Sequence, residues 1–294
     1  MRSVLLISSS ILLLASVLAT DAKAAVHLDL SYEPSGGDEL QRLDVYTPAQ
    51  QADDASARPV MVYVHGGGWV SGDKSRIGSK PDWLLEQGFI LVSVNYRLSP
   101  HSRHPTHTRD LAAALAWVAA HIADYGGDPE AIFLMGHSSG GHLVSLVATD
   151  ERFLAAHQLT PDLVKGVIAV DTNALDIEAL VRSRPPAETR LYLLTFGARP
   201  AGWRDASPSR HLAAGKPIPP FLLLVAGAGD STHRQAVAFA RLLRSTGHAG
   251  SVEVFPDQTH GSINLGLGRT DHAPTRAVER FLRDRFARTS EPGS

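Results

Sequence analysis

The chain has 294 residues, a formal net charge of −2 from 28 Lys and Arg against 30 Asp and Glu, and no cysteine. This near-neutral charge gives no electrostatic reason to expect nucleic acid or an anionic membrane surface as a partner. The lack of cysteine excludes disulfides, a cysteine nucleophile and a thiolate metal site, so the fold must depend on its apolar core.

Residues 1–24 have the pattern of a secretory signal peptide. Arg2 gives a short basic start, residues 4–18 are apolar apart from serines, and residues 22–24 read Ala-Lys-Ala, an A-x-A cleavage site. A membrane anchor is the alternative, but the apolar run is shorter than the ~20 residues that a spanning helix needs. We therefore expect an exported protein, periplasmic or secreted, without a stable membrane anchor after cleavage, whose residues 25–294 form a single domain.

The rest of the chain alternates between apolar runs that suit strands and patterns that suit helices. Strands are expected at 26–32, 43–46, 60–64, 89–94, 132–135, 164–170, 221–226 and 252–255, the first two antiparallel, and helices at 81–87, 110–122, 140–149, 232–245 and 273–286. Continuous apolar runs are typical of parallel strands that helices cover on both faces. We predict an α/β fold with a mostly parallel central sheet of about eight strands and helices on both faces.

A run of glycines follows the expected strand at 60–64, in the sequence His65-Gly66-Gly67-Gly68-Trp69. Ligands of a parallel sheet gather at the carboxyl ends of its strands, which is where this loop starts. A flexible turn is one interpretation. The other is an oxyanion hole, because backbone N–H groups without side chains let a substrate approach closely. We expect Gly67, Gly68 and the N–H of Ser139 to be its donors, and Trp69 either to line the substrate pocket or to pack in the core.

A second glycine-rich turn lies between the expected strand at 132–135 and the expected helix at 140–149. It reads Gly136-His137-Ser138-Ser139-Gly140, which is G-x-S-x-G in the strand–turn–helix setting of a nucleophile elbow. The turn is so tight that side chains at 136 and 140 would collide, which explains the glycines. We predict that Ser138 is a catalytic nucleophile.

A serine nucleophile needs a base, and the base needs an acid that orients it. After such an elbow the chain order is serine, acid, histidine. Asp230 follows the expected strand at 221–226, and we predict that it is the acid, although a helix N-cap is the alternative. Asp257 lies too close to the base along the chain. His260 follows the last expected strand and is the predicted base, with His272 as its rival.

Three histidines at regular spacing raise the question of a metal site. His101, His104 and His107 follow the expected strand at 89–94, and neutral imidazoles bind zinc. Prolines at 100 and 105 argue against a helix that would place the three rings on one face. We expect no metal and no organic cofactor, and interpret the run as a solvated loop near the pocket entrance.

Taken in order, these motifs resemble those of the α/β-hydrolase superfamily, in its carboxylesterase branch of hormone-sensitive-lipase-like and kynurenine-formamidase-like enzymes. The likeness is carried by residues 65–69, by Asn-Tyr-Arg-Leu-Ser-Pro at 95–100, by Gly-Gly-Asp-Pro at 126–129 and by residues 136–143. It implies the α/β-hydrolase fold, a triad of Ser138, Asp230 and His260, and an oxyanion hole of Gly67, Gly68 and Ser139. The helical cap that hormone-sensitive-lipase-like enzymes carry before the first strand is missing, so a partial lid would have to come from residues 172–220.

The expected activity is a serine carboxylesterase that hydrolyses small acyl or aryl esters through an acyl-enzyme. Cleavage of formamides by the same triad, as in kynurenine formamidases, is the alternative. A binding module without activity is a further one, although all three triad candidates are present. The expected partner is a small ester, and the sequence does not indicate an oligomeric state.

Overall fold

The computed structural model describes residues 25–49 and 57–289. The predicted signal peptide, residues 1–24, lies outside the described residues, and export therefore stays a prediction. Within the described ranges, no helix is both long and apolar enough to cross a membrane.

The centre of the molecule is an eight-stranded sheet in the order β1-β2-β4-β3-β5-β6-β7-β8. The strands are β1 (Ala25–Ser31), β2 (Arg42–Thr47), β3 (Arg58–Val64), β4 (Ile90–Val94), β5 (Gly127–His137), β6 (Val164–Val170), β7 (Phe221–Ala226) and β8 (Gly250–Phe255). β2 pairs antiparallel with β1 and with β4, and all the other pairs are parallel. The predicted mostly parallel α/β sheet is confirmed.

Helices connect these strands. The α-helices are α1 (Lys80–Glu86), α2 (Thr106–His121), α3 (Ser139–Thr149), α4 (Arg152–Ala155), α5 (Ile177–Arg182), α6 (Pro186–Phe196), α7 (Pro200–Asp205), α8 (Ser231–Ser245), α9 (Ser262–Leu265) and α10 (Ala273–Thr289). Short 3₁₀ helices lie at η1 (Ile122–Tyr125), η2 (Pro161–Leu163) and η3 (Pro208–Arg210). The helices predicted at 81–87, 110–122, 140–149, 232–245 and 273–286 correspond to α1, α2, α3, α8 and α10.

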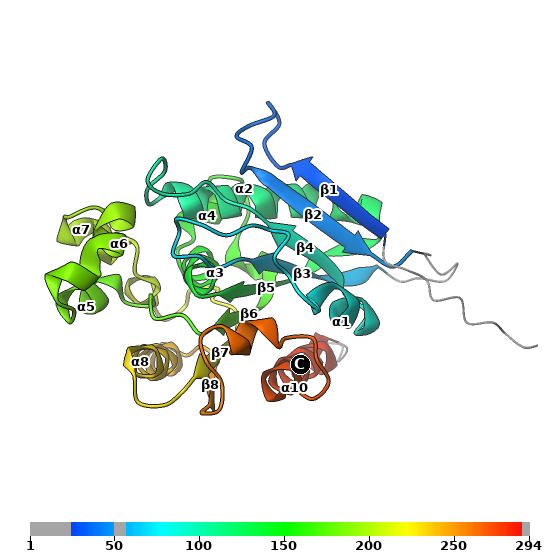
Figure 1. Cartoon of the computed structure of the whole chain (residues 1–294). Helices are drawn as coiled ribbons and strands as arrows, with labels where there is room; N and C mark the ends of the chain where they lie inside the picture. The colour runs from blue at the N-terminus through cyan, green and yellow to red at the C-terminus, as the bar shows by residue number, and fades with distance from the viewer. Residues whose placement is uncertain (1–24, 50–56, 290–294) are drawn as a thin grey trace, which may run out of the picture.

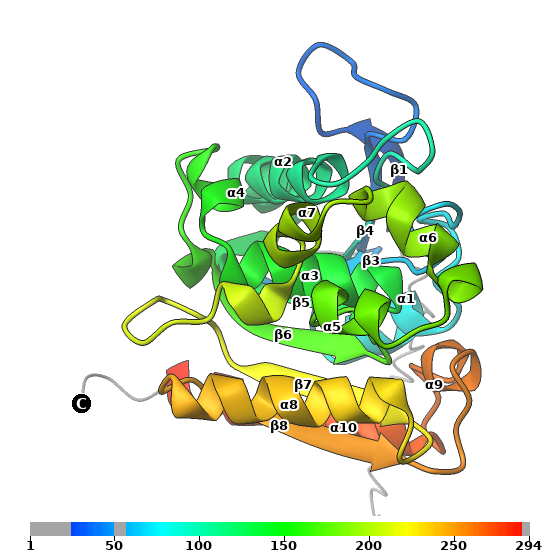
Figure 2. The same cartoon turned by 90° about the vertical axis from the view of Figure 1, so that its left-hand side faces the viewer.

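Two apolar layers form the core, one on each face of the sheet. Along β3, Val60, Val62 and Val64 pack into the layer beneath α2, α3 and α8, whereas Met61 and Tyr63 pack into the layer beneath α1 and α10. This alternation follows from the two-residue period of a strand. Figure 2 shows the arrangement at one edge, with α8 and α10 on opposite faces of β7 and β8.

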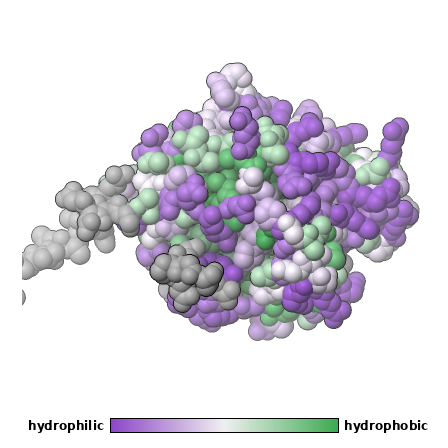
Figure 3. All heavy atoms as spheres, turned by 180° about the vertical axis from the view of Figure 1, so that it is seen from behind, coloured by the Kyte–Doolittle hydropathy of each residue, from purple (hydrophilic) through white to green (hydrophobic). Residues whose placement is uncertain are grey.

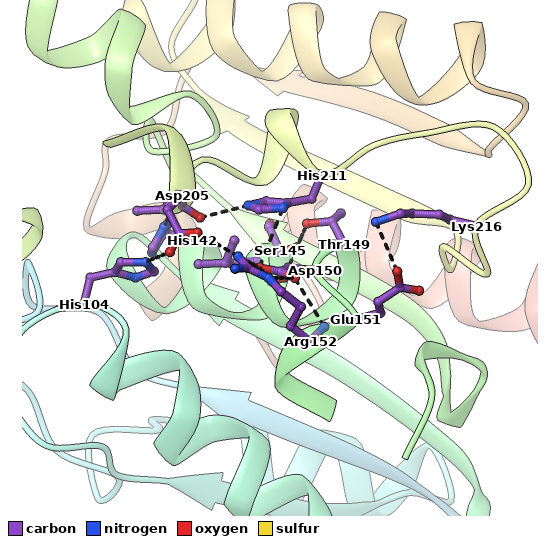
Figure 4. Close-up of polar contacts among 12 residues, drawn as sticks. His104, His142, Ser145, Thr149, Asp150, Glu151, Arg152, Asp205, His211 and Lys216 are labelled. Carbon is purple, nitrogen blue, oxygen red and sulfur yellow. Dashed lines mark hydrogen bonds and ion pairs between the residues drawn. The ribbon is translucent and has the colours of Figure 1, made fainter. Parts of the chain in front are cut away.

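Residues 172–220 separate β6 from β7 and contain α5, α6 and α7, which Figure 1 shows gathered at the end of the sheet toward which the parallel strands point. A polar network fastens this insertion to the body (Figure 4). The carboxylate of Asp205, at the end of α7, accepts from Arg152 at 2.7 Å and lies 2.9 Å from Nε2 of His104. His211 donates to the carbonyl of Asp205 at 2.8 Å.

Few large apolar side chains are exposed on the part of the surface that the structure describes. The face turned away in Figure 1 is mostly hydrophilic, with apolar residues in its upper middle and in smaller patches elsewhere (Figure 3). Large apolar side chains that are exposed in the described part of the chain include Val26 and Leu28 on the edge strand β1. A β-bulge between His27 and Leu30 interrupts the pairing of that strand, a feature that limits edge-to-edge association.

Candidate active site

Ser138 lies on the sharp turn between β5 and α3. Its backbone is in the left-handed region, with φ 54° and ψ −118°, a conformation that costs a non-glycine residue free energy. A Cβ added at Gly136 would overlap the backbone of Gly140, and one added at Gly140 would overlap the backbone of Val64. The predicted elbow is therefore present, and its glycines serve the close approach that the sequence indicated.

The hydroxyl of Ser138 lies at one end of a line of hydrogen-bonded groups. Nε2 of His260, in the loop after β8, is 3.0 Å from Oγ of Ser138. Nδ1 of the same ring is 2.6 Å from Oδ2 of Asp171. The imidazole is half exposed, with 57% of its side chain accessible, whereas the Asp171 side chain is 5% accessible. A buried carboxylate thus fixes the orientation of an exposed imidazole beside a serine hydroxyl.

Asp171 is held rigidly at the carboxyl end of β6. Its N–H donates to the carbonyl of Leu224 at 2.8 Å, and its Oδ1 accepts from the N–H of Ala226 at 2.8 Å. Its φ is 47°, which is again in the left-handed region. Because β7 fixes both the backbone and one carboxylate oxygen, only Oδ2 is left to receive the imidazole.

The prediction that Asp230 orients His260 is wrong. Asp230 is the N-cap of α8, and its Oδ1 accepts from the N–H of His233 at 2.8 Å. It lines the same pocket as Ser138, but Asp171 occupies the position at Nδ1 of His260. Asp171 offered the same kind of signal as Asp230, since it directly follows an apolar run at 164–170, but the pattern did not distinguish between the two. The capping interpretation of Asp230 is the one that the structure supports.

His137, the residue before the serine, supports His260 from behind. Its Nε2 donates to the carbonyl oxygen of His260 at 2.8 Å, and the two rings lie in contact, tilted by 38° with centroids 4.6 Å apart. Burial, and next the neighbouring His260, lower the pKa of His137 to about 4. The ring is therefore neutral near pH 7 and does not repel a positive charge on His260.

The loop after β3 brings backbone donors close to Ser138. Gly67 and Gly68 have positive φ, 126° and 63°, and a Cβ at Gly67 would overlap the backbone of Ser71. Within the described ranges, no group accepts a hydrogen bond from the N–H of Gly67 or of Gly68. Ser139 is the first residue of α3, so its N–H has no carbonyl within the helix. Gly68, Ser138 and Ser139 line one pocket.

The Trp69 side chain is buried in the core, and its small exposed part lines the pocket. It is 3% exposed and packs edge-on against Phe196 of α6, with ring centroids 5.0 Å apart. Its Nε1 donates to Nδ1 of His142 at 3.2 Å, and Nε2 of His142 donates to the carbonyl of Ala206 at 2.8 Å. Burial lowers the pKa of His142 to about 3, which keeps the ring neutral. This chain of contacts joins the glycine loop, α3 and the insertion.

The pocket beside Ser138 has a volume of about 430 Å³. Its walls come from the strand ends and from the insertion, and most of its lining side chains are polar. The lining residues are Gly68, Trp69, Ser138, Ser139, Asp171, Thr172, Asn173, Ala174, Arg184, Leu191, Tyr192, Ala226, Asp230, Ser231, Thr232, Gln258, Thr259 and His260. Polar side chains therefore surround Ser138 in this pocket.

His104, His107 and His272 have local partners. His104 pairs with Asp205, and His107 lies buried on α2, with Nε2 3.2 Å from Oγ of Ser99. His272, the rival base, is buried against Gln258, at 3.1 Å. In the part of the chain that the structure describes, no group of three His, Asp or Glu side chains could hold a metal ion.

Comparison with known proteins gives consistent matches. The profile of the BD-FAE family matches residues 43–232, more than half of the chain. The chain is 34% identical over 280 residues to the probable carboxylic ester hydrolase LipM of Mycobacterium tuberculosis, an alignment that covers 90% of this chain and 63% of LipM. It is 32% identical over 261 residues to esterase LipC of the same organism, covering 84% of this chain and 63% of LipC. The chain thus spans less than two thirds of the length of either relative.

The fold has close counterparts among solved structures. Esterase B from Lactobacillus rhamnosis superimposes with a TM-score of 0.72 at 22% identity, over 90% of this chain and 85% of that one. At this identity the match supports the fold alone. It agrees with the sheet order and with the placement of helices on both faces.

Proposed function

The chain belongs to the BD-FAE family of α/β hydrolases, and from this membership and the geometry around Ser138 we propose that the protein is a carboxylic ester hydrolase acting on small esters. The observation that carries the proposal is the line from Oγ of Ser138 through the imidazole of His260 to the carboxylate of Asp171, with distances of 3.0 and 2.6 Å. LipM and LipC, which bear the names of an ester hydrolase and an esterase, support the same class of reaction.

In the proposed mechanism Nε2 of His260 removes the proton from Ser138 as Oγ attacks the ester carbonyl. The resulting imidazolium is stabilised by Asp171, which also holds the ring in the tautomer that leaves Nε2 free to accept. The tetrahedral oxyanion accepts hydrogen bonds from the N–H groups of Gly67, Gly68 and Ser139. Loss of one such donor typically lowers kcat by about 10²- to 10³-fold.

Collapse of this intermediate releases the alcohol, which His260 protonates, and leaves Ser138 acylated. Water, activated by the same imidazole, then attacks the acyl-enzyme and releases the acid. The proton thus passes from serine to alcohol in the first half and from water to serine in the second. Every proton transfer uses one ring nitrogen, and no other side chain is needed as acid or base.

A further part of the proposal concerns the insertion at 172–220, which we interpret as a partial lid over the site. Arg184, Leu191 and Tyr192 come from it and line the pocket that contains Ser138. Its contribution would restrict the size of the substrate. A cavity of about 430 Å³ supports a preference for short acyl groups.

The test is labelling and turnover by the Ser138→Ala variant. A fluorophosphonate probe should label the wild-type protein at Ser138 and a Ser245→Ala control equally, because Ser245 ends α8 and donates only to Leu242. The Ser138→Ala variant should lose labelling and lower kcat on 4-nitrophenyl acetate by ~10⁶-fold. The formamide 4-nitroformanilide, included in the same panel, measures the alternative formamide-cleaving activity. Activity of Ser138→Ala near that of the wild type would refute the assignment.

Export is proposed on the pattern of residues 1–24 alone. Cleavage after the Ala-Lys-Ala sequence at 22–24 would leave a mature chain that starts at Ala25. N-terminal sequencing of protein recovered from the periplasm or the medium tests it directly. Exported material that still begins at Met1 would contradict the proposal.

A further inference from the structure

The side chain of Arg184 brings a positive charge to the pocket that holds Ser138. It lies between α5 and α6 in the insertion, and 25% of its side chain is exposed. Its Cζ lies 5.8 Å from the ring centroid of Tyr192, and its Nη2 donates to Oγ of Ser231 at 3.5 Å. Its Nε is buried, and no hydrogen-bond acceptor for it exists among the described residues.

The contacts that Arg184 makes leave its charge available to a ligand. Its ion pair is with Glu188, at 3.2 Å, and 57% of the Glu188 side chain is exposed. Such surface pairs contribute little free energy, so a ligand can replace them at small cost. The long 3.5 Å contact with Ser231 is equally easy to exchange.

The two carboxylates of the pocket have hydrogen-bond partners other than Arg184. Asp171 is engaged by His260 and by the N–H of Ala226, and Asp230 by the N–H of His233. Neither carboxylate forms an ion pair with Arg184 in the part of the chain that the structure describes. A neutral ester would give this guanidinium no charged partner, although its planar donors fit a carboxylate in bidentate fashion.

We propose that Arg184 binds a carboxylate on the substrate, so that the preferred esters carry one negatively charged carboxyl group in addition to the ester bond. A singly charged carboxylate suits this pocket better than a phosphate, because Asp171 and Asp230 line it as well and would repel a second negative charge. This inference rests on the proposed ester hydrolysis and adds to it a class of substrate.

The experiment compares charged and neutral esters of nearly equal size. Monomethyl succinate against dimethyl succinate places the charge on the acyl side, and acetoxyacetate against its methyl ester places the charge on the alcohol side. The variants are Arg184→Gln and, as matched control, Arg182→Gln. Arg182 also pairs with a glutamate four residues away, Glu178, but 61% of its side chain is exposed and it does not line the pocket.

We expect the ratio of kcat/KM for charged over neutral ester to fall by about 10- to 100-fold in Arg184→Gln for at least one of the two pairs, the effect of losing a hydrogen bond between charged groups. Arg184 also lines the pocket, so kcat/KM for the neutral esters should fall as well, but less than for the charged esters, which alone carry a carboxylate for it to bind. In Arg182→Gln both ratios should stay within about twofold of the wild type, since an exposed charge is screened.

An unchanged ratio in Arg184→Gln for both pairs would overturn the inference, and so would an equal fall in Arg182→Gln. If the wild type hydrolyses none of the four esters, the proposed function fails instead. Calorimetry with monomethyl succinate then still tests Arg184 in a Ser138→Ala background. Binding that Arg184→Gln weakens by tenfold or more supports a carboxylate site, and binding that it leaves unchanged excludes one.

Discussion

Asp171 and Asp230 both line the pocket beside Ser138. They differ in the backbone N–H group from which each carboxylate accepts a hydrogen bond. The N–H of His233, in the first turn of α8, donates to Oδ1 of Asp230, which is the usual role of an aspartate at a helix N-cap. The N–H of Ala226 donates to Oδ1 of Asp171, which leaves Oδ2 facing His260. The two carboxylates should therefore respond very differently to substitution.

Replacement of Asp171 by Asn should lower kcat/KM on 4-nitrophenyl acetate by about 10⁴-fold, because the amide cannot stabilise the imidazolium and favours the wrong tautomer of His260. Asp230→Ala should change kcat/KM by less than tenfold. That variant should instead lose about 1 kcal/mol of stability through the missing N-cap. Ester kinetics and urea unfolding of the two variants measure both effects, and a larger kinetic loss in Asp230→Ala would restore Asp230 as the acid.

His137 should have a measurable role of its own, because one of its ring nitrogens donates to the carbonyl of His260 and its ring contacts the ring of His260. His137→Phe keeps an aromatic ring against His260 but removes the hydrogen-bond donor, and should lower kcat/KM by about tenfold. His137→Gln offers a donor again and should recover part of the loss, with KM nearly constant in both. If the two variants have equal kcat/KM, the hydrogen bond does not position His260.

The identity of the acid was the part of the site that could not be read correctly from the residues. A strand end can be located from its apolar run, and both β6 and β7 are followed by aspartate. Which carboxylate reaches the imidazole depends on the path of the chain after the strand. Asp171 follows β6 directly with a φ of 47°, whereas Asp230 comes four residues after the end of β7. Sequence gives no measure of such directions.

At the scale of elements, the insertion at 172–220 is where expectation and structure differ most. Its helices α5 and α7 have only 6 residues each, and α6 and α7 begin with proline, so their apolar pattern was too weak to predict them. Similarly, α2 starts at Thr106, directly after Pro105, and not at residue 110. Its first turn contains His107, whose burial the polar run at 101–107 did not indicate.

The insertion is joined to the body through Asp205, whose carboxylate contacts both His104 and Arg152 (Figure 4). The hydrogen bond from His104, together with Arg152, holds the pKa of Asp205 well below its usual range, so the link is intact above pH 4 and is lost only in stronger acid. Because the side chains of Arg152 and Asp205 are 61% and 40% exposed, solvent screening limits the contribution of the link to global stability to about 1 kcal/mol. Its main effect should be local.

Asp205→Ala should therefore leave the free energy of unfolding nearly unchanged but make the insertion easier to open. We expect limited proteolysis within residues 183–200 to become several-fold faster and KM to rise, since Arg184 and Leu191 line the pocket. Glu151→Ala is the control, because it removes the 3.6 Å pair with Lys216 and spares the contacts of Asp205. Equal cleavage rates in the two variants would show that the Asp205 link does not restrain the insertion.

For the whole molecule, the order of apolar runs was enough to predict the sheet and its covering helices. Val60 to Val64 and Ile90 to Val94 are apolar at nearly every position, and both lie in the interior of the sheet. What the pattern could not predict is which charged residues the two layers would enclose. Lys80 stands between serine and proline at a helix start, where solvent exposure is the ordinary expectation, and yet it is 1% exposed.

Lys80 has carbonyl and aromatic neighbours in place of an ion-pair partner. Its Nζ donates to the carbonyl of Asn264 at 2.9 Å and lies 4.9 Å from the ring centroid of Tyr63. No carboxylate in the described residues pairs with it. Burial, which removes the ammonium group from water, lowers the pKa of Lys80 to about 7.

The lowered pKa of Lys80 makes stability depend on pH with a definite sign. Between about pH 7 and the ordinary lysine value near 10.5, the unfolded chain binds this proton and the folded protein does not, so the free energy of unfolding rises with pH. The slope due to this one group approaches ~1.4 kcal/mol per pH unit within the window. Urea unfolding of the wild type and of Lys80→Met at pH 7, 8 and 9 isolates it, since all other groups titrate in both proteins. The free energy of unfolding of the wild type should rise relative to that of the variant from each pH to the next. A constant difference between the two proteins would mean that Lys80 remains charged in the folded protein.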